Sequence, residues 1–141
     1  MGNELITANS RELATELTSY DTKMLGVFEY LGLPTDNILV KVDERRKVFK
    51  NIEDVLELLS SDTLKNSIYI SKFLSAVSTG LFDAALNYLW DETVSQLRFR
   101  VSQYDIQYFY DLSVTSDKRN KLSTEEDLVK IDDSELIQGA K

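Results

Sequence analysis

The stretch of sequence that decides the fold is residues 9–34, NSRELATELTSYDTKMLGVFEYLGLP. Asn9-Ser10-Arg11-Glu12 has the form of a capping box, in which Asn9 caps a helix and Glu12 follows three residues later. Apolar residues then recur at steps of three and four, the spacing of one helix face: Leu13, Leu17, Tyr20, Met24, Phe28 and Leu31. Gly32 and Pro34 follow in the order typical of a helix end. The stretch therefore predicts a long amphipathic helix.

The same periodicity recurs further along the chain. Asp43 is expected to cap a second helix with an apolar stripe from Val48 to Leu59, and Ser60-Ser61-Asp62 is expected to cap a short helical turn. Residues 67–102 read as helix throughout, with a stripe that drifts near Gly80. Since glycine is unfavourable inside a helix, either one helix bends there or two helices meet.

The last forty residues alternate between short helices and polar connections. A strongly aromatic helix is expected over residues 105–112, and residues 116–121 read as a loop. Another short helix opens at Ser123-Thr124-Glu125-Glu126, and Asp132-Asp133-Ser134 caps a final one. In that final helix Leu136 and Ile137 have no continuing apolar face, which is typical either of a domain that ends in a frayed helix or of the N-terminal part of a longer protein.

One segment departs from the helical pattern. Ile38, Val40 and Val42 alternate with polar neighbours, so residues 37–42 favour a short extended piece. A single strand cannot form a sheet, and we expect an ordered crossing segment. The predicted fold is all-α, an irregular bundle of about five to six helices in one domain over residues 1–141.

Composition excludes several kinds of chemistry. The 141 residues suit one domain with its own core. The absence of cysteine and histidine removes disulfides, thiolate nucleophiles, histidine bases and the usual zinc ligands. No complete catalytic site, cofactor site or metal site is recognisable, so whether this chain is an enzyme stays open. The net charge of −8 opposes binding to a phosphate backbone on average.

The sequence also predicts where the protein works. The N-terminus lacks the basic and apolar regions of a signal peptide. No apolar run approaches the roughly 20 residues that a membrane span requires. We therefore expect a cytoplasmic protein without a membrane partner.

A basic cluster is the first candidate site. Arg45, Arg46, Lys47 and Lys50 crowd the first turns of the second helix, where positive charge opposes the helix dipole. Such a cluster is a candidate contact for phosphates or for an acidic partner. The alternative is a set of surface ion pairs with acidic residues further along the same helix: Glu53, Asp54 and Glu57.

An aromatic run is the second candidate. The run contains three tyrosines and a phenylalanine within seven residues: Tyr104, Tyr108, Phe109 and Tyr110. Tyrosines this close together are typical of a protein interface or of a helical core. They could also stack on bases, but few basic residues accompany them. The sequence leaves open whether these tyrosines belong to the core or to an interface.

The segment from Ser71 to Val94, SKFLSAVSTGLFDAALNYLWDETV, resembles the early helices of bacterial HEPN-like proteins of abortive-infection and phage-defence systems. The resemblance implies a helical bundle that often forms dimers. Active family members cut RNA with an Arg followed closely by a His, and this chain has no His. No catalytic residue is therefore carried over. Glu92 is the one polar position of the matched segment to follow.

Three functions follow from these observations. The first is a non-catalytic protein-interaction or oligomerisation module of a HEPN-like defence protein, with a protein partner or a second copy of itself. The second is the N-terminal half of a HEPN RNase whose Arg/His motif lies after residue 141, the one case in which RNA would be bound. The third is an acidic inhibitor or nucleic-acid mimic.

Overall fold

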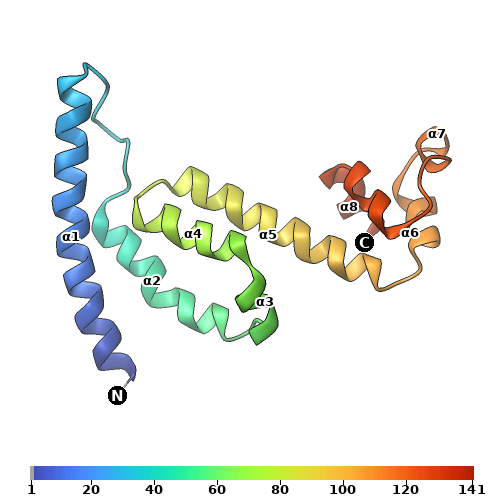
Figure 1. Ribbon diagram of the computed structural model, residues 1–141, viewed down its shortest axis with the longest axis horizontal. Helices are drawn as coiled ribbons and strands as arrows, with labels where there is room; N and C mark the ends of the chain where they lie inside the picture. Colours follow the sequence, from blue (N-terminus) through green and yellow to red (C-terminus); the bar gives the residue numbers. More distant parts are fainter. Residues whose placement is uncertain (1) are drawn as a thin grey trace. The chain divides into compact units, whose positions relative to one another are not determined.

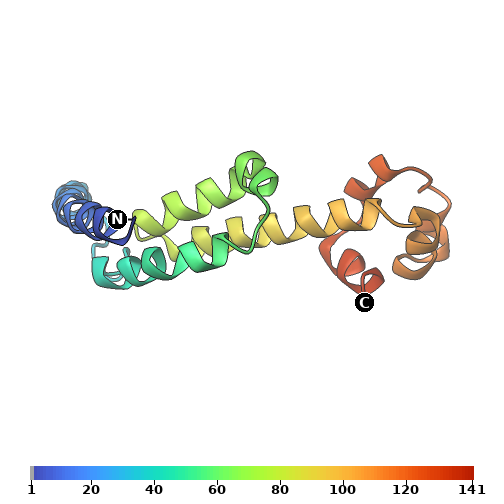
Figure 2. The same cartoon turned by 90° about the horizontal axis from the view of Figure 1, so that it is seen from below.

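The protein is all-α. The computed structural model describes the backbone of residues 2–141 and the side chains of residues 11–52 and 54–141. Within that range the chain forms helices and no strand, as Figure 1 and Figure 2 show. The elements are α1 (Gly2–Tyr30), α2 (Val42–Leu56), α3 (Ser61–Asn66), α4 (Ile68–Ser78), α5 (Phe82–Ser102), α6 (Ile106–Ser113), α7 (Ser116–Arg119), the 3-10 helix η1 (Glu125–Lys130) and α8 (Asp133–Gly139).

The chain divides into two compact units. Unit 1 is Met1–Leu89 and unit 2 is Trp90–Lys141, whereas the sequence predicts a single domain. Among the described helices, none is long and apolar enough to cross a membrane.

The long first helix is present, but it begins earlier than expected. α1 starts at Gly2, so Asn9 lies in the helix interior and does not cap it. The end agrees better with the prediction, since α1 stops at Tyr30 and Gly32 adopts a φ of 73°. That left-handed conformation lets the Leu33 N–H donate to the Phe28 carbonyl at 2.8 Å, which closes the helix end.

The segment after α1 is not extended. Residues 36–39 form turns and bends, and Asn37 has a φ of 57°. The alternation of apolar residues therefore does not produce a strand here, because no neighbouring strand is available among the described residues to pair with it. Val42, expected at the end of the extended piece, is instead the first residue of α2, so Asp43 lies in its first turn.

The helical stretch over residues 67–102 is two helices. Ser67 caps α4 by accepting a hydrogen bond from the Ile70 N–H at 3.1 Å. Gly80, with a φ of 77°, separates α4 from α5, and α4 lies beside the first part of α5 in both views. Three small or medium-sized residues are buried at this contact: Ala76, Val77 and Ala85. Partly buried aromatic and apolar side chains of unit 1 pack against them: Val48, Phe49, Phe73, Phe82, Ala84 and Tyr88.

Unit 2 has its own core. Its members come from the second half of α5 and from every later segment except α7: Val94, Val101, Phe109, Tyr110, Leu122, Leu128, Ile131 and Leu136. The expected helix at 105–112 is α6, and the expected caps hold for η1 and α8, where Thr124 and Asp132 form capping boxes. The expected loop at 116–121 contains the one-turn helix α7.

The apolar residues of the final helix do find a core. Leu136 is fully buried in unit 2, and Ile137 is half-buried. The sequence shows no apolar face that continues beyond these residues, and their burial comes instead from the packing of α8 on α6.

Candidate interaction site

The aromatic run divides between core and surface. Phe109 and Tyr110 are buried, and their rings meet edge to face with centroids 6.0 Å apart. The Tyr110 hydroxyl donates to the Thr124 carbonyl at 2.7 Å, and burial of the phenol raises the pKa of Tyr110 to about 12. Tyr110 is thus a core residue, which removes it from the possible interface aromatics that the sequence offered.

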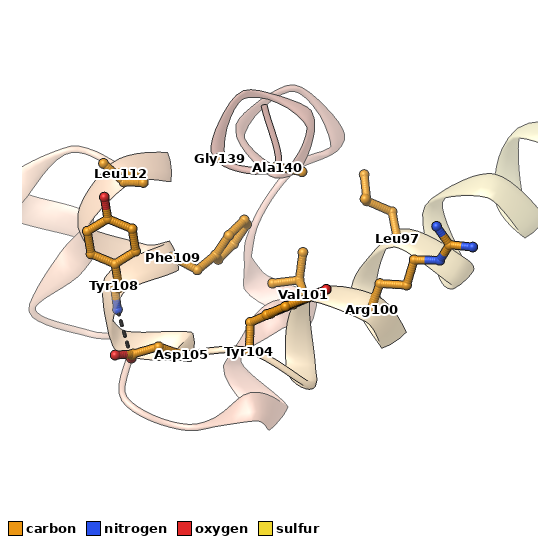
Figure 3. A pocket seen from close by; sticks show the side chains of 10 residues that line it. All are labelled: Leu97, Arg100, Val101, Tyr104, Asp105, Tyr108, Phe109, Leu112, Gly139 and Ala140. Atoms are coloured by element: carbon orange, nitrogen blue, oxygen red, sulfur yellow. Dashed lines mark hydrogen bonds between the residues drawn. The ribbon is translucent and has the colours of Figure 1, made fainter.

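Tyr104 and Tyr108 lie on the surface. They are 79% and 63% exposed, so most of the surface of each side chain is accessible to water. Both line a groove of about 510 Å³ in unit 2, shown in Figure 3. The groove is formed by the end of α5, by α6 and by the end of α8: Leu97, Arg100, Val101, Tyr104, Asp105, Tyr108, Phe109, Leu112, Gly139 and Ala140.

Local hydrogen bonds form the turn between the two tyrosines. Asp105 caps α6, and one carboxylate oxygen accepts hydrogen bonds from the backbone N–H groups of Gln107 at 3.0 Å and Tyr108 at 3.1 Å. Tyr104 precedes this cap and Tyr108 follows it, so the sharp turn between α5 and α6 presents their rings at the rim of the groove (Figure 3).

Close packing of α8 shapes the opposite wall. A Cβ placed on Gly139 would lie 2.6 Å from the Cβ of Ser113 and 2.7 Å from Cε2 of Phe109. Only glycine allows this approach, since any larger residue would push α8 away from α6. No local pattern marked Gly139 as part of a site, because its role depends on contacts with residues about thirty positions earlier.

The groove is lined by one charged residue of each sign. Arg100 is exposed on the rim, and Figure 3 shows its guanidinium directed away from the ring of Tyr104. The carboxylate of Asp105 accepts hydrogen bonds from the N-terminus of α6 and also lines the groove. Among the described residues that line it, the groove therefore combines an apolar floor, two exposed tyrosines, the guanidinium of Arg100 and the carboxylate of Asp105.

The basic cluster of α2 also divides. Arg45 is only 1% exposed, and its guanidinium lies inside unit 1. Its Nη2 and Nη1 donate to the two carboxylate oxygens of Asp21 at 2.5 and 3.2 Å, respectively. Two backbone carbonyls accept the other hydrogen bonds: Val40 accepts from Nε at 2.6 Å, and Ser78 accepts from Nη1 at 3.0 Å. The burial removes Arg45 from any surface contact with phosphate or a partner, which corrects the sequence-based expectation.

The other three cations of the cluster are exposed, but acidic neighbours balance two of them. Arg46 pairs with Asp43 at 3.7 Å, and Lys47 pairs with Glu44 at 2.8 Å. The hydrogen bond from Lys47 to Glu44 also raises the pKa of Lys47. These partners precede the cations, whereas the sequence pointed to acids that follow them; of those, the Glu53 side chain lies outside the described residues. Lys50 is exposed.

Two further observations complete the survey of candidate sites. Glu92 is buried at the start of unit 2, where its Oε1 accepts a hydrogen bond from the Gln96 amide at 2.9 Å. Among the described side chains, no group of three or more acidic residues is arranged to hold a metal ion.

Comparisons with protein families, with curated proteins and with solved structures find no match to this chain. The candidate site therefore stands on its own geometry.

Proposed function

We propose that this chain is a protein-interaction module, and that the groove of unit 2 binds a short segment of a partner protein. The observation that carries the proposal is the pair of exposed tyrosines, Tyr104 and Tyr108, at the rim of an apolar groove. Tyrosine combines a large apolar ring with a polar end, and it is enriched among residues that dominate binding energy at interfaces.

The size and charge of the groove indicate which kind of ligand it can bind. A volume of about 510 Å³ suits a few side chains of a peptide, not a whole domain. The exposed guanidinium of Arg100 favours a carboxylate at one end of that segment, because charge complementarity selects and orients a partner. The expected ligand is a peptide with apolar anchors beside an Asp or Glu.

Selection from displayed random peptides on the full chain tests the proposal. We expect enriched peptides to carry apolar residues next to an acid, and to bind at least about tenfold more weakly to Tyr104→Ala and Tyr108→Ala variants. An Arg100→Glu variant should change the preference from acidic to basic peptides.

Tyr30→Ala is the matched control, because Tyr30 is an equally exposed tyrosine of α1 in unit 1. Peptides that bind the groove should bind this variant as they bind the wild type. If no peptide is enriched, or if the enriched peptides bind the Tyr104 and Tyr108 variants unchanged, the groove is not a docking site.

The same proposal places the module in a HEPN-like defence protein. Its support is that the segment with the resemblance, Ser71 to Val94, spans most of α4, Gly80 and the first part of α5. The native reading frame provides the test. A continuation that encodes an Arg closely followed by a His would favour an RNase of this family, and substitution of that pair should then abolish RNA cleavage. A stop codon would favour a non-catalytic module.

A further inference from the structure

α1 carries an exposed apolar ridge. Leu13, Tyr20 and Val27 are 42%, 50% and 55% exposed, although they belong to a long helix that packs on α2. They recur every seven residues, and Leu31, four residues after Val27, continues the same face just past the end of the helix. A seven-residue repeat keeps side chains on one narrow face of a helix over several turns. These four residues are called the α1 ridge below.

The remainder of unit 1 uses a neighbouring face of α1. Leu17, Met24 and Phe28 are half-buried there, and Asp21 reaches Arg45 of α2 from the same face. In both views no described element of unit 1 lies on the side of α1 opposite to α2 (Figure 1, Figure 2). The exposed fractions of Leu13, Tyr20 and Val27 show that the α1 ridge is an apolar surface that unit 1 itself leaves open.

The charges beside the ridge are complementary to a second copy of the same helix. Glu16 and Lys23 are both exposed, lie on the same flank of the ridge, and take part in no ion pair among the described side chains. If two α1 helices pair antiparallel about Tyr20, Glu16 of each copy lies beside Lys23 of the other. A parallel pair would instead place Glu16 beside Asp21 of the other copy, so that two negative charges repel each other. Charged residues that flank an apolar helix face determine in this way whether two helices pair parallel or antiparallel.

The available area sets the strength of such a pair. Four partly exposed side chains offer on the order of 100 Å² each, so two copies would bury roughly 800 Å² in total, the size of a weak, transient interface. A dimer of this size is weak and reversible, and its population depends on protein concentration.

The geometry points to self-association through α1: two copies pair antiparallel along the α1 ridge, with Leu13 facing Val27 of the other copy and Tyr20 near the twofold axis. This surface lies in unit 1, so the inference is independent of the groove proposed as a peptide site in unit 2.

Charge reversal on the full-length chain tests both the surface and the orientation. Glu16→Lys and Lys23→Glu should each raise the dimer dissociation constant about three- to tenfold at low salt, measured by sedimentation equilibrium. An equimolar mixture of the two variants should recover wild-type affinity. In the mixed dimer the two introduced charges face each other, and so do the two native ones, so both flanking pairs again join opposite charges.

Glu29→Lys is the matched control, since it makes the same charge change as Glu16→Lys at an exposed position on the opposite face of α1. It should leave the dissociation constant unchanged. Circular dichroism of each variant should show wild-type helicity, because all three positions are exposed.

Disulfide trapping supplies a second readout, and the absence of native cysteine makes it unambiguous. Leu13→Cys and Val27→Cys chains, when mixed, should form a mixed disulfide dimer under mild oxidation. Leu13→Cys alone should not, because the two copies of position 13 lie about 21 Å apart in the antiparallel pair.

Three results would each overturn the inference: a strictly monomeric wild-type chain at several hundred micromolar, charge-reversed variants that associate like the wild type, or cross-linking of Leu13→Cys with itself in place of Val27→Cys.

Discussion

Replacement of Asp21 by asparagine should selectively destabilise unit 1. The substitution keeps the size of the side chain and one oxygen that can accept from Arg45, but it removes the negative charge. Arg45 would then keep its charge in a buried site, with two backbone carbonyls and a neutral amide as its partners. A buried charge without a counter-charge is costly, because the protein interior solvates it poorly.

The magnitude follows from the burial of the two partners. Removal of one member of a fully buried ion pair costs about 3–5 kcal/mol. The Asp21 side chain is 16% exposed, so water reaches that side of the pair, and the carbonyls of Val40 and Ser78 continue to accept. We therefore expect a loss of about 2–3 kcal/mol in the free energy of unfolding of unit 1.

Urea unfolding followed by two signals measures this loss. Far-UV circular dichroism reports both units, whereas the fluorescence of the single tryptophan, Trp90, reports unit 2, where its indole N–H donates to Asp133 at 2.8 Å. A loss of about 2–3 kcal/mol corresponds to a midpoint about 1–2 M urea lower for a unit of this size. The helical signal should show an early transition, while the Trp90 transition should stay in place.

Asp43→Asn is the control for this experiment. Asp43 also faces an arginine of α2, but its pair with Arg46 is on the surface, and such pairs contribute at most about 1 kcal/mol. The reasoning about Arg45 would be refuted if Asp21→Asn and Asp43→Asn shifted the dichroism midpoint equally, or if Asp21→Asn moved the Trp90 transition by the same amount.

Three further predictions concern single residues. Gly80→Ala should lower the free energy of unfolding by at least about 2 kcal/mol, measured by urea unfolding followed by circular dichroism. A left-handed alanine is strained, and its Cβ would lie 2.6–2.7 Å from the Arg45 guanidinium. An unchanged free energy of unfolding would exclude that contact. Tyr110→Phe should cost about 1 kcal/mol at neutral pH. Because the folded-state pKa of Tyr110 is raised to about 12, the contribution of its hydroxyl to wild-type stability should be complete below about pH 10 and should fall as pH rises toward 12. Unfolding followed by Trp90 fluorescence should show a smaller loss of stability at alkaline pH in the variant than in the wild type. Equal losses in the two proteins would contradict the role of the Tyr110 hydroxyl. Asp105→Ala should cost about 1 kcal/mol through loss of the α6 cap, measured in the same fluorescence assay, and an unchanged midpoint would show that the cap is dispensable.

The features that the sequence predicts well are local. The cap at Asp132 depends on hydrogen bonds to backbone groups within three residues, so the local sequence pattern reveals it. The break at Gly80 is local too, since glycine tolerates the positive φ that ends α4. The all-α class follows because it needs only the three-and-four periodicity of apolar residues.

Arg45 shows what local reasoning misses. Its charged neighbours suggested a surface cluster, but its partner Asp21 lies 24 residues earlier and Ser78 lies 33 residues later. The sequence did contain a signal, because Arg45 is in helical register with the apolar positions Phe49 and Ile52 of α2. A cation on a buried stripe predicts a buried ion pair, whereas a cation off the stripe predicts a surface one.

The tyrosines follow the same rule. Ile106, Phe109, Tyr110 and Ser113 fall at steps of three and four on α6, and they are its buried or half-buried face. Tyr108 lies off that face, which separates it from Tyr110. The groove itself was beyond prediction, because its far wall comes from the end of α8 and sequence spacing does not give that contact.

The wide spacing of the partners of Arg45 also constrains the order in which unit 1 can form during synthesis. α1 and α2 are complete once residue 56 has been made, yet the guanidinium still lacks the Ser78 carbonyl and the close-packed Gly80. At about 5–20 residues per second, that gap lasts roughly one to five seconds on a ribosome. In that interval Arg45 is partly accessible to water in the nascent α1–α2 pair, whereas it is buried in the finished unit. Unit 1 should therefore close in one late cooperative step, and nascent chains that end before Gly80 should remain sensitive to proteases.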